Sequence, residues 1–415
     1  MTKNCRMCGS MRLRQFLDLG FTPPADGFLR AEQLLEPETH YPLQVCQCED
    51  CGLAQLTHVV SPEILYRHDY PYESSITRSG QLHWQEFAQN VSARFDLGEA
   101  DLVVDVGSNV GVLLDRFRSH GTRVLGVDPA SNIVRIAERR GIETWDEFFG
   151  LPVARRIRDE RGAASLITAT NVFAHVDDLR EFMLAVDLLL DDRGVFIFEA
   201  PQFRHLVQQF EYDTIYHEHL SYLSLKPLLP FLHALGLEVF DVEERDIHGG
   251  SFRVFVGRHG DRPVAAAVDA MLRAEEASGI YEPLRLGRFA RDVAANRDEL
   301  ASLLSSLKSQ GKRIAGVSAP AKGMTLLNYC GIGAGLLDFV TEKSQLKIGR
   351  FTPGSHIPVV SDAELLRQRP DFALLLAWNF GEEIMQSLHE YVQGGGRFII
   401  PVPHPRIVEP SVSAH

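Results

Sequence analysis

The chain is short of several features that would assign it at once to a class of protein. None of its apolar runs approaches the ~20 residues that cross a bilayer, and cysteines stand near the N-terminus where a secretory signal would carry charged and then apolar residues. Acidic residues outnumber basic ones, 55 to 42, so the formal net charge is −13 and the basic footprint of a nucleic-acid binder is missing. We therefore expect a cytoplasmic protein that acts on a small molecule and binds neither nucleic acid nor a membrane.

Cysteine is scarce and unevenly placed. Five of the six cysteines lie in the first eighth of the chain: Cys5, Cys8, Cys46, Cys48 and Cys51. Such clustering indicates a metal site in a reducing compartment rather than a disulfide framework. The knuckles Cys5-x-x-Cys8 and Cys48-x-x-Cys51 together predict a tetrahedral, structural zinc site whose metal helps to fold this segment. The long gap between the knuckles predicts an inserted hairpin, and Cys46 is left as a spare cysteine.

The length of 415 residues calls for two or three domains. After a helix at about 77–94, apolar runs alternate with helical stretches, which predicts a parallel, doubly wound sheet. Its strands are expected at 102–106, 123–127, 164–169 and 194–198, with antiparallel edge strands near 237–243 and 252–257. A charged, largely helical stretch at 263–310 then leads into a second α/β pattern, with strands at 313–317, 372–376 and 397–401.

The sequence thus predicts a Rossmann-like α/β domain at 65–262, preceded by a small zinc-binding domain at 1–64 and followed by a second Rossmann-like α/β domain at 263–415. No heptad pattern or long exposed apolar helix calls for an oligomer. The lone Cys330 is interpreted as a small buried apolar residue.

A glycine loop follows the first strand of the central domain. Gly107 and Gly111 permit close approach of a ligand to the backbone, and Asp128 ends the second strand, where an acidic residue binds ribose hydroxyls. The dinucleotide fingerprint G-x-G-x-x-G is absent, which disfavours a dehydrogenase. The pattern instead indicates a methyltransferase that uses S-adenosylmethionine. The residues predicted here to line the cofactor are Asp105, Gly107, Asn109, Gly111, Asp128 and, near the adenine, Phe149.

Two groups of polar residues suggest proton chemistry. His175 follows the fourth strand, at the edge where ligands bind in open α/β sheets, although a packing or capping role is the alternative. Tyr216-His217-Glu218-His219 places two imidazoles, a carboxylate and a phenol in four consecutive positions. This composition suits the removal of a proton from a carbon atom.

Long motifs along the chain add a resemblance to a known family. They are Cys5-x-x-Cys8, Cys48 to Leu56, Tyr70 to Ser75, Gly107-Ser108-Asn109, Asn171 to His175, Asp213 to His219, His248 to Ser251, Gly331-Ile332-Gly333, Pro353 to Pro358 and Ala377 to Phe380. With them the chain resembles, nearly end to end, the three-domain, S-adenosylmethionine-dependent C-methyltransferases of deoxysugar biosynthesis. These enzymes methylate C3 of nucleotide-linked 4-keto hexoses.

The resemblance implies a mechanism in which a proton next to a ketone is removed and the resulting enolate carbon takes the methyl group. It implies that His219 is the base, that Tyr216 and Glu218 hold the sugar and orient the base, and that His175 lies near the ketone. It also assigns Asn171 to the binding pocket.

Further roles follow from the same resemblance. Tyr72 is expected in the substrate pocket, with Tyr70 as the fallback, and His217 is expected to be structural. The C-terminal domain of the family covers the active site and helps to bind the sugar nucleotide. The candidates for diphosphate contact are Lys322, Lys347 and Arg350, for which ordinary surface charge is the alternative.

Two departures from the family pattern stand out. Val110 replaces an acidic residue that many members carry in the cofactor loop, and Thr341 to Gln345 departs from an aspartate-containing turn. Two other functions stay open at this point. One is O- or N-methylation of a sugar with the same base, and the other is a non-catalytic, zinc-containing binding module. The sugar, its nucleotide, the stereochemistry of methylation and the product do not follow from the sequence.

Overall fold

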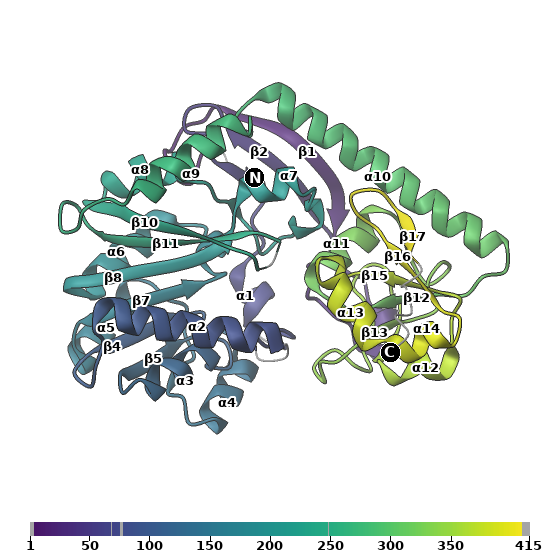
Figure 1. Cartoon of the computed structure of the whole chain (residues 1–415), viewed down its shortest axis with the longest axis horizontal. Coiled ribbons are helices and arrows are strands. Elements are labelled where there is room, and N and C mark those ends of the chain that lie inside the picture. Colours follow the sequence, from purple (N-terminus) through teal and green to yellow (C-terminus); the bar gives the residue numbers. More distant parts are fainter. Residues whose placement is uncertain (1–3, 68, 75–77, 248, 409–415) are drawn as a thin grey trace. The chain divides into compact units, whose positions relative to one another are not determined.

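The computed structural model describes residues 4–67, 69–74, 78–247 and 249–408 (Figure 1). Two motif residues named above, Ser75 and His248, therefore lie outside the described residues. The chain divides into two compact units. The first unit comprises Met1–Arg14, Cys46–Arg204 and Glu218–Tyr281, and the second comprises Gln15–Val45, His205–His217 and Glu282–His415.

The first unit is built on a seven-stranded sheet with the order β10-β11-β8-β7-β4-β5-β6. Its strands are β4 (Leu102–Val106), β5 (Arg123–Val127), β6 (Thr144–Trp145), β7 (Ala164–Thr170), β8 (Leu190–Pro201), β10 (Leu237–Arg245) and β11 (Ser251–Arg258). Strands β4 to β8 pair in parallel, whereas β11 pairs antiparallel with both β8 and β10. The predicted parallel sheet with an antiparallel edge is confirmed.

Helices cover both faces of this sheet, which explains its apolar strands. All five residues of β4 are buried, as expected for a parallel strand packed on both sides. On one face, apolar side chains of the sheet share a core with α5 (Leu151–Arg161), α6 (Leu179–Leu189), α8 (Leu225–His233) and α9 (Ala266–Ala277). The remaining helices of the central segment are α2 (Arg78–Phe95), α3 (Val112–Ser119) and α4 (Ser131–Arg139).

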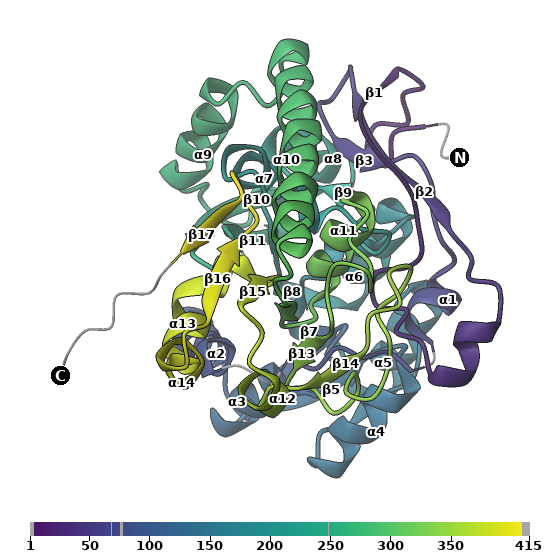
Figure 2. The ribbon, with the colours of Figure 1, turned by 90° about the vertical axis from the view of Figure 1, so that its right-hand side faces the viewer.

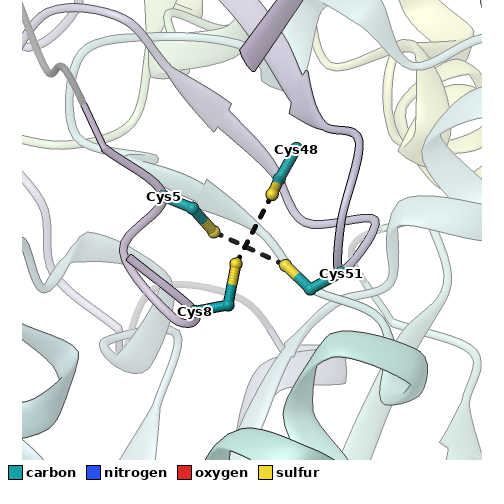
Figure 3. Close-up of side chains that lie close together, drawn as sticks. All are labelled: Cys5, Cys8, Cys48 and Cys51. Atoms are coloured by element: carbon teal, nitrogen blue, oxygen red, sulfur yellow. Dashed lines mark hydrogen bonds between the residues drawn. The ribbon is translucent and has the colours of Figure 1, made fainter. Parts of the chain in front are cut away.

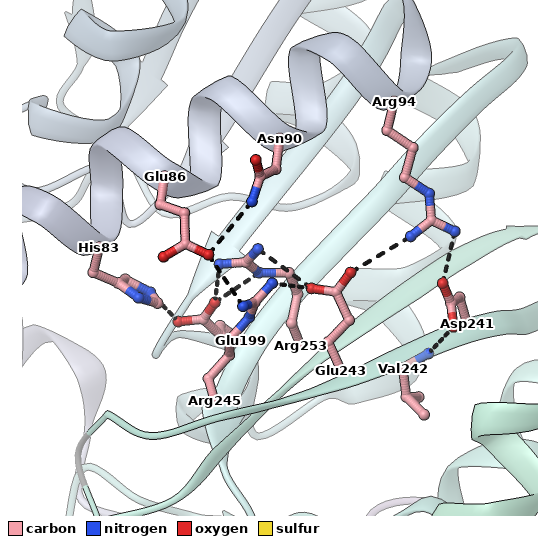
Figure 4. Close-up of polar contacts among 10 residues, drawn as sticks. All are labelled: His83, Glu86, Asn90, Arg94, Glu199, Asp241, Val242, Glu243, Arg245 and Arg253. Carbon is pink, nitrogen blue, oxygen red and sulfur yellow. Dashed lines mark hydrogen bonds and ion pairs between the residues drawn. The ribbon is translucent and has the colours of Figure 1, made fainter.

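A buried ionic network fixes α2 to the sheet (Figure 4). Glu199 of β8 accepts from Nε2 of His83 at 2.6 Å through one oxygen and from Arg253 of β11 at 2.8 Å through the other. The guanidinium of Arg253 also lies 3.9 Å from the ring centre of Phe87 on α2. Glu199 and Arg253 are almost fully buried, and since each charge is paired, the network holds the helix without a desolvated lone charge.

The cysteine knuckles flank two strands, β1 (Leu13–Thr22) and β2 (Tyr41–Cys48). These are neighbours in a four-stranded sheet with the order β1-β2-β3-β9, completed by β3 (Ala54–Leu56) and β9 (Ser221–Tyr222). The predicted insertion between the knuckles is therefore confirmed. Short helical segments of this part are η1 (Ala31–Leu35) and α1 (Pro62–Tyr66).

The second unit contains a six-stranded sheet with the order β14-β13-β12-β15-β16-β17. Its strands are labelled between Figure 1 and Figure 2. Its strands are β12 (Ile314–Val317), β13 (Val340–Glu342), β14 (Val359–Ser361), β15 (Phe372–Leu375), β16 (Arg397–Ile400) and β17 (Arg406–Val408). All pairs are parallel except β16 with β17. The predicted second α/β pattern is confirmed.

Further helical segments belong to this unit. They are η3 (Tyr212–Thr214), α10 (Pro283–Ser309), α11 (Ala321–Tyr329), α12 (Ala363–Gln368), η4 (Trp378–Phe380), α13 (Gly381–Ser387) and α14 (His389–Gln393), while α7 (Phe203–Gln208) begins in the first unit. Side chains of α12, α13 and α14 share an apolar core with the sheet. Among the described residues, no helix has the length and apolar character needed to cross a membrane.

Candidate active site and metal centre

The four knuckle cysteines of the first unit converge on one point (Figure 3). The Sγ atoms of Cys5, Cys8, Cys48 and Cys51 all lie within 4.8 Å of one another. Sγ of Cys5 is 3.5 Å from that of Cys51, and Sγ of Cys8 is 3.5 Å from that of Cys48. Tetrahedral zinc with Zn–S bonds of about 2.3 Å requires sulfur atoms roughly 3.8 Å apart, so this set fits zinc.

The cysteine site is closed by protein ligands. The four thiols fill a tetrahedral coordination shell and leave no position for a reacting molecule, which is the arrangement of a structural metal. Cys46, the spare cysteine, points elsewhere, because its Sγ lies 3.5 Å from the carbonyl oxygen of Gln55. The hydrogen bond between Cys5 and Cys51 lowers the pKa of Cys5 to about 5 and raises the pKa of Cys51 well above its ordinary value, so one of the two thiols gives up its proton much more readily than the other.

The glycine loop joins β4 to α3 in a conformation that its sequence makes possible. Gly107 and Gly111 have φ values of 67° and 75°, a region that glycine enters without strain. A Cβ atom on Gly107 would lie 2.3 Å from Cγ2 of Val172. Packing against the neighbouring loop therefore demands glycine at this position, independently of any ligand.

Two buried carboxylates stand at the edge of the sheet beside this loop. Oδ2 and Oδ1 of Asp128, which follows β5, accept from the backbone N–H groups of Asn109 and Ala130, both at 2.9 Å. Oδ1 of Asp105 accepts from Oγ1 of Thr168 at 2.6 Å. Burial raises the pKa of Asp128 to about 6 and that of Asp105 to about 7. Among the described residues, neither carboxylate forms an ion pair with a basic side chain.

Two asparagines tie the segment 70–74 to the carboxyl edge of the sheet. The side chain of Asn109 donates to the carbonyl oxygen of Tyr72 at 3.0 Å and accepts from the N–H of Ser74 at 2.9 Å. The side chain of Asn132 likewise bonds both backbone groups of Tyr70, at 2.8 and 3.1 Å. These paired bonds fix an irregular segment that has no strand or helix of its own.

A cluster of aromatic and acidic side chains lies within the same unit. The ring centres of His175 and His219 are 5.0 Å apart. Oη of Tyr70 donates to Oε2 of the buried Glu218 at 3.0 Å, and Oη of Tyr66 lies 3.2 Å from Nδ1 of His175. Segments far apart in the sequence, namely the end of α1, the segment 70–74, η2 (Phe173–His175) and the run after η3, thus contribute to one site.

His175 is neutral in this setting. Burial, with a smaller contribution from His219, holds the pKa of His175 well below its ordinary value. Its Nε2 atom is buried and has no hydrogen-bond partner among the described residues. A neutral imidazole with one buried nitrogen left over can present a hydrogen bond to a bound molecule.

Comparison with known proteins identifies the family. Family models match three consecutive parts of the chain: a zinc binding domain at residues 5–66, a methyltransferase domain at 80–242 and a C-methyltransferase C-terminal domain at 246–403. The C-methyltransferase NovU of Streptomyces niveus is 38% identical over 405 residues, which cover 97% of this chain and 96% of that protein. The chain belongs to the C-methyltransferase family.

More distant relatives share less of the chain. A ubiquinone biosynthesis O-methyltransferase of Bordetella avium is 27% identical over 123 residues, which cover 29% of this chain and 48% of that protein. A solved S-adenosylmethionine-dependent methyltransferase of Clostridium acetobutylicum is 18% identical, covers 43% of this chain and 92% of its own, and has a TM-score of 0.36.

As a C-methyltransferase the protein uses S-adenosylmethionine, and its N-terminal segment is a zinc-binding domain in which four cysteines cluster. The predicted fold class, an α/β methyltransferase with an N-terminal zinc-binding segment and a further C-terminal domain, is confirmed.

The predicted binding residues of this C-methyltransferase lie in different surroundings: at the sheet edge, in the apolar core and on the surface. Asn171 has a φ of 57°, and its N–H donates to the carbonyl oxygen of Glu199 at 2.7 Å, so it stands at the carboxyl edge of the sheet. Phe149 packs edge-on against Phe182 at 5.3 Å and joins the sheet's apolar core. Tyr72 is 41% exposed, and its backbone rather than its ring makes the bond to Asn109.

The histidine run crosses from one unit to the other. Glu218 and His219 belong to the first unit, whereas Tyr216 and His217 belong to the second. His217 is buried, and its ring packs edge-on against Tyr41 with Nε2 3.3 Å from the Tyr41 carbonyl oxygen. Tyr216 is half-buried.

The three predicted diphosphate contacts all lie in the second unit. Nζ of Lys347 donates to the carbonyl oxygen of Ala319 at 2.8 Å and lies 3.4 Å from Asp26, with both side chains buried. Nζ of Lys322 is 3.9 Å from the buried Asp213 and 4.5 Å from the ring centre of Trp378. Arg350 is half-buried.

Two tyrosines lie beside His175 and Glu218 that the sequence did not assign to this site as first choices. Tyr66 received no role, although its hydroxyl contacts His175, and Tyr70 was only the fallback for Tyr72. A signal for Tyr66 was available in the pattern, because Pro62 opens a short helix in which Leu65 is buried and Tyr66 follows at its end.

Proposed function

We propose that this C-methyltransferase removes a proton from the carbon next to the ketone of a nucleotide-linked keto sugar and methylates that carbon. The specific substrate class we propose is a 4-keto deoxyhexose methylated at C3. The pairing of His175 and His219, with Glu218 and Tyr70 beside them, is the observation that supports the proposal. It offers a base and a hydrogen-bond donor close together, which the removal of a proton next to a carbonyl group requires.

In this proposal His219 takes the proton from carbon, because imidazole is the side chain most often used as a general base at neutral pH. The electron pair moves onto the ketone oxygen, to which His175 donates a hydrogen bond. Glu218 and Tyr216 hold the sugar and orient the base. S-adenosylmethionine, when bound, supplies the methyl group that the carbon receives.

We assign the cofactor to the loop at the end of β4. The carboxylate of Asp128 would bind the ribose hydroxyls, with Asp105, Gly107, Asn109 and Gly111 forming the wall of the site. Phe149 and Asn171 complete the proposed cofactor contacts. The buried, uncompensated charges of Asp105 and Asp128 support this assignment, because hydroxyl and ammonium groups are the partners that such carboxylates accept.

We assign the sugar nucleotide to the C-terminal region at 263–415, with 65–262 as the methyltransferase domain and 1–64 as the zinc-binding domain. The proposed contacts are Tyr72, Lys322, Lys347 and Arg350. Support comes from the family model of a C-methyltransferase C-terminal domain. Of the two lysines, Lys322 is the stronger candidate, because its Nζ makes no hydrogen bond among the described residues, whereas that of Lys347 does.

The experiment that tests the function follows hydrogen exchange at carbon. A panel of nucleotide-linked 4-keto hexoses is incubated with the protein in deuterated water, with and without S-adenosylmethionine, and analysed by mass spectrometry. We expect enzyme-dependent deuterium uptake without the cofactor and a gain of one methyl group with it. His219→Asn should lower both rates by about 10²-fold to 10⁴-fold, the usual contribution of a general base.

The neighbouring His217→Asn serves as the matched control, because its ring packs on Tyr41 and has no proposed role in proton transfer. Thermal unfolding of both variants shows whether they are folded. If fragmentation located the new methyl group on oxygen or nitrogen, the proposed methylation of carbon would be wrong and heteroatom methylation would take its place. No exchange and no methylation across the panel would refute the keto-sugar substrate.

A further inference from the structure

The hydroxyl of Tyr66 contacts one of the two ring nitrogens of His175. Tyr66 ends α1, and its Oη lies 3.2 Å from Nδ1 of His175. The two rings are nearly parallel, with an angle of 12° between them and 6.0 Å between their centres. The contact therefore sets both the position of the imidazole and its orientation.

The other nitrogen of the same ring, Nε2, belongs to an imidazole that neighbours His219. Nε2 of His175 is buried without a hydrogen-bond partner among the described residues, and the ring lies 5.0 Å from that of His219. A neutral imidazole carries one proton, so whichever nitrogen accepts a hydrogen bond leaves the other as the donor. If Oη of Tyr66 donates to Nδ1, the proton of His175 resides on Nε2.

We propose that Tyr66 is a positioning residue that donates a hydrogen bond to Nδ1 of His175 and thereby holds His175 in the tautomer whose Nε2–H donates to the substrate oxygen. The inference rests on the proposed function for the identity of that oxygen, but not for the tautomer itself. Burial keeps His175 neutral, so a single proton has to be placed on one nitrogen or the other. A buried donor without a partner is unfavourable in the free protein and becomes satisfied when a carbonyl oxygen binds.

Nuclear magnetic resonance decides the tautomer without reference to any reaction. The protein with zinc bound is labelled with ¹⁵N in its histidine rings, and His175→Asn identifies the signals of His175 by their disappearance. We expect the wild-type ring to carry its proton on Nε2. In Tyr66→Phe, which keeps the ring and removes the hydroxyl, we expect a mixture of both tautomers. A proton on Nδ1 in the wild type, or an unchanged tautomer in Tyr66→Phe, would overturn the proposal.

Kinetics provide the second measurement. Tyr66→Phe should lower kcat for methyl transfer by about 10-fold to 100-fold, toward the loss caused by removing an oxyanion donor, while KM for S-adenosylmethionine stays within about twofold. The matched control is Tyr222→Phe, because Tyr222 lies in the same unit, is buried, and has a hydroxyl without a hydrogen-bond partner among the described residues. Equal losses of kcat in the two variants would make Tyr66 merely structural.

The two measurements separate failure of this inference from failure of the proposed function. If the tautomer shifts in Tyr66→Phe but the wild type transforms no keto sugar, the contact stands and the substrate is wrong. If the wild type methylates a keto sugar and the tautomer does not respond to Tyr66→Phe, the function stands and the positioning role is refuted.

Discussion

Each of the two units places a strand, a loop and a helix at the centre of a parallel sheet, and the two loops differ in chemistry. The loop from β4 to α3 has positive φ values at Gly107, Asn109 and Gly111. The loop from β12 to α11 contains Ser318, Ala319 and Pro320, and only Ser318 has a positive φ, of 66°. Two loops in the same topological position therefore differ in backbone conformation and need not have the same function.

Charge separates the two loops further. In the second unit the protein's own side chains bind the loop: the N–H of Ala319 donates to Glu342 at 3.1 Å, and its carbonyl oxygen accepts from Lys347, which is paired with Asp26. In the first unit, Asp105 and Asp128 are buried without a paired cation among the described residues. At the second loop, the protein's own lysine and aspartate pair their charges. At the first loop, two carboxylates have no paired cation, so a bound ligand could supply their partner groups, which favours the first loop as the cofactor site.

The largest effect is expected at the internal ion pair of the second loop. Lys347→Met should lower the free energy of unfolding by about 3–5 kcal/mol, because it leaves the Asp26 carboxylate buried without its partner. Chemical denaturation checks this value, and S-adenosylmethionine affinity, measured by calorimetry, should stay unchanged.

Lys347→Met combined with Asp26→Leu provides the control, because removal of both charges should restore most of the lost stability. The single variant also tests the proposed contact between Lys347 and the sugar nucleotide. A higher KM for the sugar nucleotide with unchanged stability would show that Lys347 contacts the substrate instead of stabilising the loop.

The next effect is expected at Gly107 in the first loop. Gly107→Ala should lower the free energy of unfolding by about 2–5 kcal/mol, the sum of a strained φ and a forced contact with Val172. Gly162→Ala is the matched control, since Gly162 has a φ of 94° and no atom within 4 Å of a Cβ placed there. Adding Val172→Ala to Gly107→Ala should recover part of the difference. Equal losses at Gly107 and Gly162 would remove packing as the cause.

A pH dependence should distinguish the first loop from the second. Burial raises the pKa of Asp128 from its ordinary 3.8 to about 6, so acid protonates the carboxylate proposed to bind the cofactor ribose. S-adenosylmethionine affinity, measured by calorimetry, should therefore fall about 10-fold between pH 7.5 and pH 5, because roughly one tenth of the carboxylate stays ionised at pH 5. Asp128→Asn should bind more weakly and with a smaller pH dependence, which leaves the contribution of Asp105, whose pKa burial raises to about 7.

Stability should respond to the same titration with the opposite sign. The folded-state pKa of Asp128 lies above its unfolded value, so its contribution to stability is complete below about pH 3.8 and is lost as the pH rises through about 6. Without cofactor, the wild type should therefore lose stability as the pH rises through about 6, and Asp128→Asn, whose amide accepts only one of the two backbone N–H bonds, should lack this pH dependence. Cofactor affinity that rises with acid would contradict the role of the ionised carboxylate.

Those parts of the molecule that depend on local pattern were predictable from the sequence. The cysteine knuckles met because their spacing fixes the geometry of each turn, and the buried strands of the first sheet followed from continuous apolar runs such as Leu102–Val106. The carboxyl-edge positions of His175 and Asp128 followed from their places after strands. The methyltransferase and C-methyltransferase identity was confirmed by the family models and by the relative from Streptomyces niveus.

Those parts that depend on irregular backbone were not predictable in the same way. The choice between Tyr70 and Tyr72 is made by the asparagines that hold the segment 70–74, and no periodicity reveals which ring an irregular segment turns inward. Lys347 was predicted as a diphosphate contact, with surface charge as the alternative. Its ion pair with Asp26 was not predicted, because burial of a lysine requires a partner and Asp26 lies more than 300 residues away in the sequence.

The smallest effect is expected where the second loop keeps a strained residue. Ser318 adopts a φ of 66° without being glycine, so Ser318→Gly should relieve strain and raise the free energy of unfolding by about 0.5–1 kcal/mol after the added entropy of the unfolded chain. Asn109→Gly in the first loop relieves a similar φ of 50° but removes both side-chain bonds to the segment 70–74. It should therefore destabilise the protein and weaken S-adenosylmethionine binding, which Ser318→Gly should leave unchanged. If both variants changed the free energy of unfolding and the S-adenosylmethionine affinity in the same direction, the contacts of Asn109 would not be what holds its strained backbone. The distinction between the two loops would then fail.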